Sequence, residues 1–176
     1  MKRTKNKYHQ NKLYIGIDNG VSGTIAICFN NEIRLIQTPV FSEQNYTKAK
    51  KNITRVNIQE LSNWILAILE EFDIEATFCL IERPMVNPGR FSASISAVRA
   101  LETTLNVIEY YNIPYQYIDS REWQKALLPS GIKGAPELKK ASMHIGCRLF
   151  PQFKEQITKH KDADGLLIAE YCRRYY

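Results

Sequence analysis

Three carboxylate side chains stand at positions where packing alone gives them no role. Asp18 ends the apolar run "YIGID", Glu82 ends "FCLIE", and Asp164 stands at the start of the apolar C-terminal segment. Buried like charges repel one another, so a cluster of these acids needs a cation to neutralise it. Hard oxygen ligands favour Mg²⁺ or Mn²⁺ over Zn²⁺. The three acids therefore indicate a two-metal site of the kind that hydrolyses phosphodiesters with an activated water.

The sequence leaves the fourth ligand of such a site open. Asp162, two residues before Asp164, is either a ligand or the N-cap of the following helix. His160 is the alternative, as a ligand or as a general base. The three main acids also have simpler interpretations, as a turn residue (Asp18), a surface ion-pair partner (Glu82) and a dipole-favoured acid in a first helical turn (Asp164). The order of the acids along the chain is stronger evidence for a metal site than any single acid.

The elements that must position the acids follow from the hydrophobic pattern. Residues 13–18, 24–29 and 33–37 are apolar runs separated by turn signals, which predicts a three-stranded antiparallel meander. The continuous apolar run 77–81 is typical of a central parallel strand, and 114–118 is a second, shorter strand. Helical spacing is expected over 57–72, 92–110, 120–127 (capped by Ser120), 136–150 and 162–176. The order predicts an α/β fold with a mixed five-stranded sheet and helices on both faces.

Positive charge is unevenly spread along the chain, whose net charge is +6. The first twelve residues carry five lysines and arginines and no acid, which predicts a basic N-terminal arm (1–12) before a single nuclease domain (13–176). Such an arm is either solvated or in contact with phosphates. The polar segment Phe41–Val56, with Lys48, Lys50, Lys51 and Arg55, is expected to be a long exposed basic loop.

The composition also excludes several classes of protein. No run approaches the roughly 18–20 apolar residues that span a bilayer, and the basic N-terminus lacks the apolar core of a secretory signal. We therefore expect no membrane contact. The cysteines are too far apart for a zinc pattern and are expected to be free thiols in a reducing cytoplasm: Cys28, Cys79, Cys147 and Cys172.

Four stretches together resemble the RuvC-type Holliday junction resolvases, especially those carried by phages: "YIGIDNGVSGTIAI", "LIERP", "EWQKAL" with "LKKASMHIGCRLFP", and "KDADGLLIAEYCRR". The resemblance runs from Leu13 to Arg174 and places Asp18, Glu82 and Asp164 at the catalytic carboxylate positions. It implies an RNase H-like fold, a homodimer and two Mg²⁺ per active site, with Mn²⁺ able to substitute. It also implies symmetric nicking of four-way DNA junctions, in the cytoplasm of a bacterial or phage-infected cell.

The chain departs from the family pattern at three positions. Asn19 and Gly165 stand where the family commonly has proline and alanine. Lys161 lies three residues before Asp164, where the family often has its fourth ligand, so Asp162 and His160 compete for that role.

Basic and aromatic residues near these motifs are candidates for holding DNA, whose affinity for protein comes largely from phosphate contacts. The basic candidates are Arg83, Arg90, Lys125, Lys133, Lys139 and Lys140. Lys125 and Lys139 fall where the resemblance places lysines near the scissile phosphate, and we expect Lys125 to stabilise charge in the transition state. Phe91 is either a wedge that stacks on an unpaired base or a staple that fixes the next helix to the core. Small residues in "SASISAV" suggest a dimer contact.

The sequence thus predicts a crossover junction endodeoxyribonuclease. Within the same fold, a broader branched-DNA debranching nuclease and an RNase H-like enzyme acting on RNA–DNA hybrid remain open. A catalytically inactive junction-binding protein is less favoured, because a binder gains nothing from clustered acids near phosphates. An actin-like ATPase shares the opening motif but needs two such domains and a second glycine-rich phosphate loop, which this chain lacks.

Overall fold

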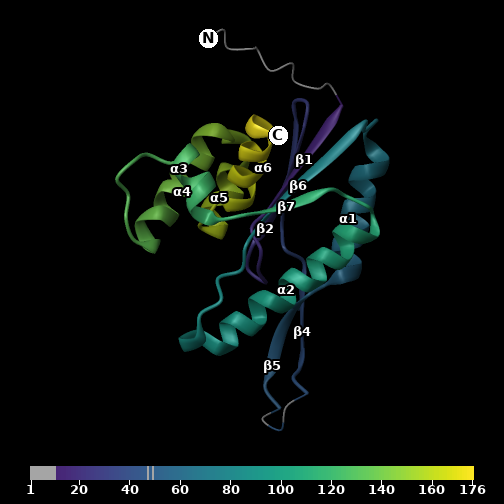
Figure 1. Cartoon of the computed structure of the whole chain (residues 1–176), viewed down its shortest axis with the longest axis vertical. Helices are drawn as coiled ribbons and strands as arrows, with labels where there is room; N and C mark the ends of the chain where they lie inside the picture. Colours follow the sequence, from purple (N-terminus) through teal and green to yellow (C-terminus); the bar gives the residue numbers. More distant parts are fainter. Residues whose placement is uncertain (1–10, 47, 49) are drawn as a thin grey trace.

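The computed structural model describes residues 11–46, 48 and 50–176, so most of the expected N-terminal arm lies outside the described residues. A mixed five-stranded sheet stands at its centre, with neighbouring strands in the order β3, β2, β1, β6 and β7 (Figure 1). Its strands are β1 (Lys12–Ile17), β2 (Thr24–Phe29), β3 (Glu32–Gln37), β6 (Ala76–Glu82) and β7 (Tyr115–Ile118). The first three pair antiparallel, whereas β6 runs parallel to β1 and β7 parallel to β6. The predicted meander and parallel extension are confirmed.

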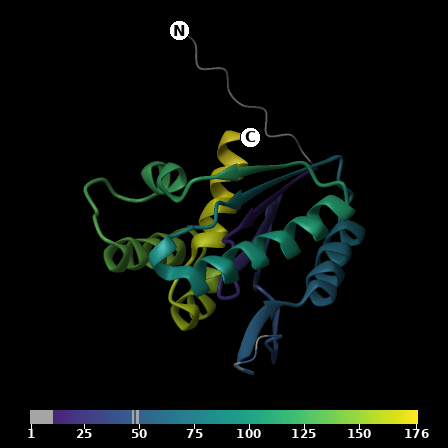
Figure 2. The same ribbon diagram turned by 60° about the horizontal axis from the view of Figure 1, so that its bottom comes forward.

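Helices cover both faces of the sheet, as predicted (Figures 1 and 2). The helices and 3₁₀ turns are α1 (Ile58–Glu71), η1 (Pro88–Arg90), α2 (Phe91–Tyr110), α3 (Ser120–Leu127), α4 (Ala135–Leu149), η2 (Pro151–Phe153), α5 (Lys154–His160) and α6 (Asp164–Tyr175). Alternation along β1 explains the two layers, since Leu13, Ile15 and Ile17 pack toward α1 and α2 while Tyr14 packs toward α6.

The structure corrects two local predictions about helices. The N-cap of α3 is Asp119, and Ser120 is the first helical residue rather than the cap. Helix α5 was not predicted, because its seven residues are almost all polar and only Ile157 is buried. A short helix with one core contact leaves no periodic hydrophobic signal in the sequence.

The predicted basic loop over 41–56 is wrong. This segment forms an antiparallel hairpin of β4 (Val40–Gln44) and β5 (Asn52–Val56), which projects away from the main sheet (Figures 1 and 2). Most residues of both strands are exposed, so the alternation of apolar and polar side chains that reveals a strand is absent. Cross-strand pairs such as Val40 with Val56, and the Arg55–Glu43 ion pair at 2.7 Å, hold the hairpin together instead.

All four cysteines are free thiols, three of them buried, in agreement with the sequence analysis. Within residues 11–46, 48 and 50–176, no helix is both long enough and apolar enough to cross a membrane.

Helix α6 lies directly against β1, and Gly16 makes this approach possible. A Cβ atom at Gly16 would overlap the backbone nitrogen of Ala169 and lie 2.6 Å from the carbonyl oxygen of Gly165. Both obstacles are helix backbone, so neither can move without shifting α6 as a whole. There is therefore no room for even one methyl group between this strand and the helix that carries Asp164.

We expect Gly16→Ala to lower the free energy of unfolding by about 3 kcal/mol or more, the upper end of the cost of overpacking. Urea unfolding followed by circular dichroism measures the change. Gly89→Ala is the matched control, because a Cβ there meets only the Asn87 side chain at 3.3 Å. Equal stability of the two variants would contradict the close packing of α6 on β1.

Candidate active site

Parallel pairing of β1 and β6 brings two of the predicted acids to one edge of the sheet. Ile17 pairs with Ile81, so Asp18 and Glu82 follow directly at the ends of adjacent strands. Asp164 begins α6 and reaches the same edge, where the backbone N–H of Gly165 donates to Thr24 Oγ1 at 3.1 Å. A Cβ at Gly165 would lie 2.6 Å from the Thr24 carbonyl oxygen, which explains why alanine does not replace this glycine here.

The electrostatics show that the acids form one cluster. Burial, followed by the charges of Asp164, Glu82 and Asp162, raises the pKa of Asp18 well above its ordinary value. Burial and the charge of Asp164 raise the pKa of Glu82 to about 7. Burial also raises the pKa of Asp164 to about 6, with a further contribution from Asp162. Each carboxylate is therefore costly to ionise without a nearby cation.

Two hydrogen bonds orient the carboxylates and favour their charged forms. The indole Nε1 of Trp123 donates to Glu82 Oε2 at 3.3 Å, and the hydroxyl of Ser142 donates to Asp164 Oδ1. Both bonds lower the pKa of the acid they contact, although burial outweighs them. Sequence analysis missed both donors. Ser142 lies three residues after Lys139 on α4, so the two side chains share one face of the helix. Because Lys139 was a predicted site residue, this spacing could have identified Ser142.

Asp162 faces the cluster and does not cap α6. The N-cap is Ala163, without a side-chain cap bond, so the capping interpretation of Asp162 is wrong. Lys161 adopts a left-handed conformation (φ 66°) after α5, in the turn that leads into Asp162. The Asp162 side chain is only 5% exposed. Its Oδ1 atom has no hydrogen-bond partner among the described residues.

Two cationic or titratable side chains approach the other oxygen of Asp162. Lys139 Nζ lies 3.4 Å from Oδ2, and His160 Nε2 lies 3.6 Å from the same atom. The side chain of Gln37 is hydrogen-bonded to His160 Nδ1 at 2.8 Å, while His160 Nε2 is buried without a hydrogen-bond partner among the described residues. His160 and Asp162, the two candidates for the fourth ligand, are thus neighbours.

The donor set fits a hard divalent cation, although the ligand sphere is not closed. Among the described residues, no group of three or more His, Cys, Asp or Glu side chains could hold a metal ion as the side chains stand. The buried Asp162 Oδ1 atom without a partner and the raised pKa values of Asp18, Glu82 and Asp164 nevertheless mark missing positive charge. Oxygen donors of this kind match Mg²⁺ or Mn²⁺ and not Zn²⁺.

A hollow of about 310 Å³ opens beside Asp18 and Glu82 and is also lined by Arg83 and Arg90. Arg83 is held by Asp119 at 3.2 Å and lies over the ring of Tyr117. Of the predicted basic residues, the structure thus brings Arg83 and Arg90 to the hollow and Lys139 to Asp162. The remaining three are exposed on or near α3 and α4, and none contacts the acids: Lys125, Lys133 and Lys140, the last paired with Glu137.

Phe91 does not staple α2 to the core, because its side chain is 72% exposed. It begins α2 beside an apolar groove of about 370 Å³ that also includes Val86, Ile95 and Val98. Asn19, which replaces the family's proline, donates its side-chain amide to the carbonyl oxygen of Ala97 at 3.2 Å. That bond ties the turn after β1 to α2.

Comparison with solved structures assigns the fold to the RuvC type within the RNase H-like class. A structure described as Thermus thermophilus RuvC in complex with Holliday junction substrate superposes with a TM-score of 0.55 at 14% identity, covering 90% of each chain. Another T. thermophilus RuvC structure gives a TM-score of 0.46 at 14% identity, over 89% of this chain and 90% of that one. The yeast mitochondrial Holliday junction resolvase Ydc2 gives 0.41 at 17% identity, over 94% and 78%.

At the level of sequence, the protein belongs to the family DUF3882, described as Lactococcus phage M3 protein, which matches residues 16–173. No curated protein matches the chain. The predicted resemblance to RuvC-type proteins and the predicted fold are confirmed.

The raised pKa values predict how stability depends on pH without metal. Folded Glu82 and Asp164 bind more protons than the unfolded chain between their ordinary pKa values near 4 and their folded values of about 7 and 6. The free energy of unfolding should therefore fall as pH rises through this window. Glu82→Gln keeps an acceptor for Trp123 but removes one charge. This substitution should raise the free energy of unfolding at pH 8 by about 1–3 kcal/mol and weaken its dependence on pH.

Urea unfolding in chelator at a series of pH values provides the test. Glu137→Gln is the control, because that acid is exposed on α4 and pairs only with Lys140. A wild-type stability that rises between pH 5 and pH 8 would contradict the cluster.

Proposed function

We propose that this protein is a Mg²⁺-dependent endonuclease that cuts branched DNA and resolves four-way junctions by paired nicks. The observation that carries the proposal is the convergence of Asp18, Glu82, Asp162 and Asp164 at one sheet edge, with three of their pKa values raised by burial and mutual repulsion. The RuvC-type fold supports it, because one solved structure of that type is described in complex with Holliday junction substrate.

In this proposal the four acids hold two Mg²⁺ ions. Bound Mg²⁺ would supply Lewis acidity at the scissile phosphate and lower the pKa of the water nucleophile. Ser142 and Trp123 hold one oxygen each of Asp164 and Glu82, which leaves the other oxygens of these groups for cations. His160 lies beside Asp162, with Nε2 at 3.6 Å from Oδ2, and is itself hydrogen-bonded to Gln37.

Lys139 is the better-placed lysine for the reacting phosphate. Its ammonium group lies at Asp162, whereas Lys125 is exposed on α3 on the far side from the buried Trp123. A cation at this position stabilises negative charge that develops in the transition state. Lys125, Lys133 and Lys140 are assigned to more distant contacts with the DNA backbone, together with Arg83 and Arg90.

Paired nicks require two active sites, so we propose that the active form is a homodimer. Exposed apolar residues on α2, Ile95 and Val98, support a contact through this helix. The small residue Ser94 of the same helix is buried instead, where its hydroxyl bonds the backbone of Asn87. The proposed contact therefore combines these apolar residues with the exposed small residues Ser92 and Ala93.

The test uses labelled four-way, Y-shaped, duplex and RNA–DNA hybrid substrates with Mg²⁺. We expect symmetric paired nicks in the four-way junction and little cleavage of plain duplex. Equal cleavage of all branched substrates would favour a debranching nuclease, and cleavage of the hybrid alone would favour an RNase H-like enzyme. Single unpaired nicks would contradict the dimer.

Asp18→Asn serves as the control for contaminating nucleases. It should reduce cleavage about 10²-fold or more while junction binding persists, because one charged donor to the cations is lost. Full activity of this variant would overturn the proposed mechanism.

Phe91→Ala separates a DNA contact from a packing role. Because the side chain is 72% exposed, the melting temperature should stay within about 2 °C of wild type. Junction cleavage should fall about 10-fold, since stacking of an aromatic ring on a base contributes about 1–3 kcal/mol. Phe91→Trp keeps a stacking surface and should retain activity. A cleavage rate unchanged by the alanine would contradict the wedge.

A further inference from the structure

The β4–β5 hairpin leaves the main sheet at the edge that holds the acid cluster. Strands β1 and β3 both pair antiparallel with β2, so they point in the same direction and end at the same edge. The chain then continues through Thr38, whose backbone N–H donates to the Gly23 carbonyl at 3.0 Å. Gly23 lies against Asp18, since a Cβ there would be 3.3 Å from Asp18 Oδ2. The root of the hairpin is therefore next to the carboxylates.

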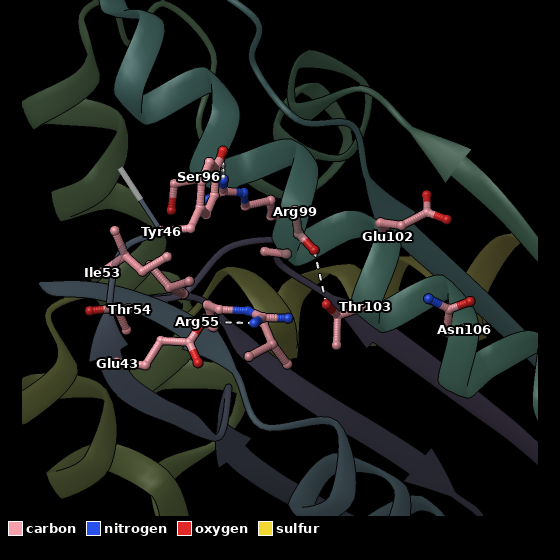
Figure 3. A pocket seen from close by; sticks show the side chains of 13 residues that line it. Glu43, Tyr46, Ile53, Thr54, Arg55, Ser96, Arg99, Glu102, Thr103 and Asn106 are labelled. Atoms are coloured by element: carbon pink, nitrogen blue, oxygen red, sulfur yellow. Dashed lines mark hydrogen bonds and ion pairs between the residues drawn. The ribbon is translucent and has the colours of Figure 1, made fainter. Parts of the chain in front are cut away.

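The hairpin is braced at its root, at its turn and against α2. The N–H of Asn57 donates to the Pro39 carbonyl at 2.8 Å, and the N–H of Asn45 donates to the Lys51 carbonyl at 2.7 Å. Arg99 of α2 donates to the hydroxyl of Tyr46 at 2.8 Å and also lies over its ring. Figure 3 shows Tyr46 and Arg99 meeting across a hollow of about 400 Å³ between the hairpin and the helix. The hairpin is thus closed by its own backbone hydrogen bonds and is held against α2 by the contact between Tyr46 and Arg99.

The turn of the hairpin carries three exposed lysines, Lys48, Lys50 and Lys51. Its only acid, Glu43, lies one strand pair from the turn and is already paired with Arg55 (Figure 3). Within the described part of the chain, none of the three lysines forms an ion pair with an acid. The hairpin therefore presents a concentrated positive charge with no counter-charge of its own.

We infer that the β4–β5 hairpin holds a duplex arm of the DNA substrate through the backbone phosphates that its lysine tip contacts. This inference rests on the proposed function, because the hairpin begins at the sheet edge where Asp18 and Glu82 would cut the DNA. Duplex DNA presents a dense row of phosphates, and lysines contact them without reading sequence. The hairpin therefore sets the position and affinity of one arm, while chemistry stays at the acids.

The simplest alternative is that the lysines only protect an exposed strand edge from pairing with other chains. The two interpretations differ in their consequence for DNA. If the lysines only protect the strand edge, removing their charge should cause aggregation and leave the affinity for DNA unchanged. A phosphate contact predicts weaker binding and a smaller dependence on salt.

The experiment compares the triple variant K48Q/K50Q/K51Q with its charge-preserving counterpart K48R/K50R/K51R. Binding to four-way junctions with long and with short arms is measured in Ca²⁺ over a range of salt concentrations. The glutamine variant should bind the long-armed junction about 10-fold or more weakly. Its slope of log K against log salt should fall in magnitude by about 2–3, since each phosphate contact contributes about 0.9. The short-armed junction should be affected less, and the arginine variant should match wild type.

The outcomes separate this inference from the proposed function. A wild-type protein that cuts junctions, with a glutamine variant of unchanged affinity and salt slope, overturns the hairpin inference alone. Equal losses on long-armed and short-armed junctions also overturn it, because the contact would then lie at the junction centre. A wild-type protein that cuts no branched DNA overturns the proposed function. In that case, the same titration on plain duplex still decides whether the hairpin binds phosphates.

Discussion

Repulsion among carboxylates buried at a single sheet edge is the constraint that organises this molecule. Asp18 and Glu82 end adjacent parallel strands, so the pairing that forms the core also forces their charges together. Each neighbour offsets part of that cost: Ser142 and Trp123 through hydrogen bonds, and Lys139 through its charge. The offset is incomplete, since the pKa values of Asp18, Glu82 and Asp164 stay raised. Because these buried carboxylates repel one another, the site favours binding of a cation.

The remaining acids reach the cluster only because α6 approaches the sheet without side chains in between. Gly16 of β1 and Gly165 of α6 leave room for backbone-to-backbone contact, and Gly146 of α4 leaves room for the Cβ methyl group of Ala163. Ala163 sits between Asp162 and Asp164, so the packing of one methyl group fixes the placement of two carboxylates. The geometry of the proposed site thus depends on the absence of side-chain volume as much as on the acids themselves.

The sheet, the principal helices and the acids were predictable because each depends on strong local signals. Long apolar runs bounded by turns defined β1 and β6, and carboxylates at their ends were conspicuous for lack of a packing role. The hairpin was missed because its strands are mostly exposed and carry no alternation. Ser142, Trp123 and Gln37 were missed because their roles arise from contacts across 22, 41 and 123 positions of the chain. The role of Asp162 could not be separated from capping until the backbone turn at Lys161 was known.

The contact between Trp123 and Glu82 gives the proposed site an internal optical reporter. The indole is fully buried and donates its only N–H to a carboxylate whose ionisation changes over the range from weak acid to neutrality. Emission from a buried indole depends on the charge next to its ring nitrogen. Proton loss from Glu82 and cation binding at the proposed site would each change that charge. The chain's second tryptophan, Trp64, lies in the other core layer with α1, so the two fluorophores sample opposite faces of the sheet.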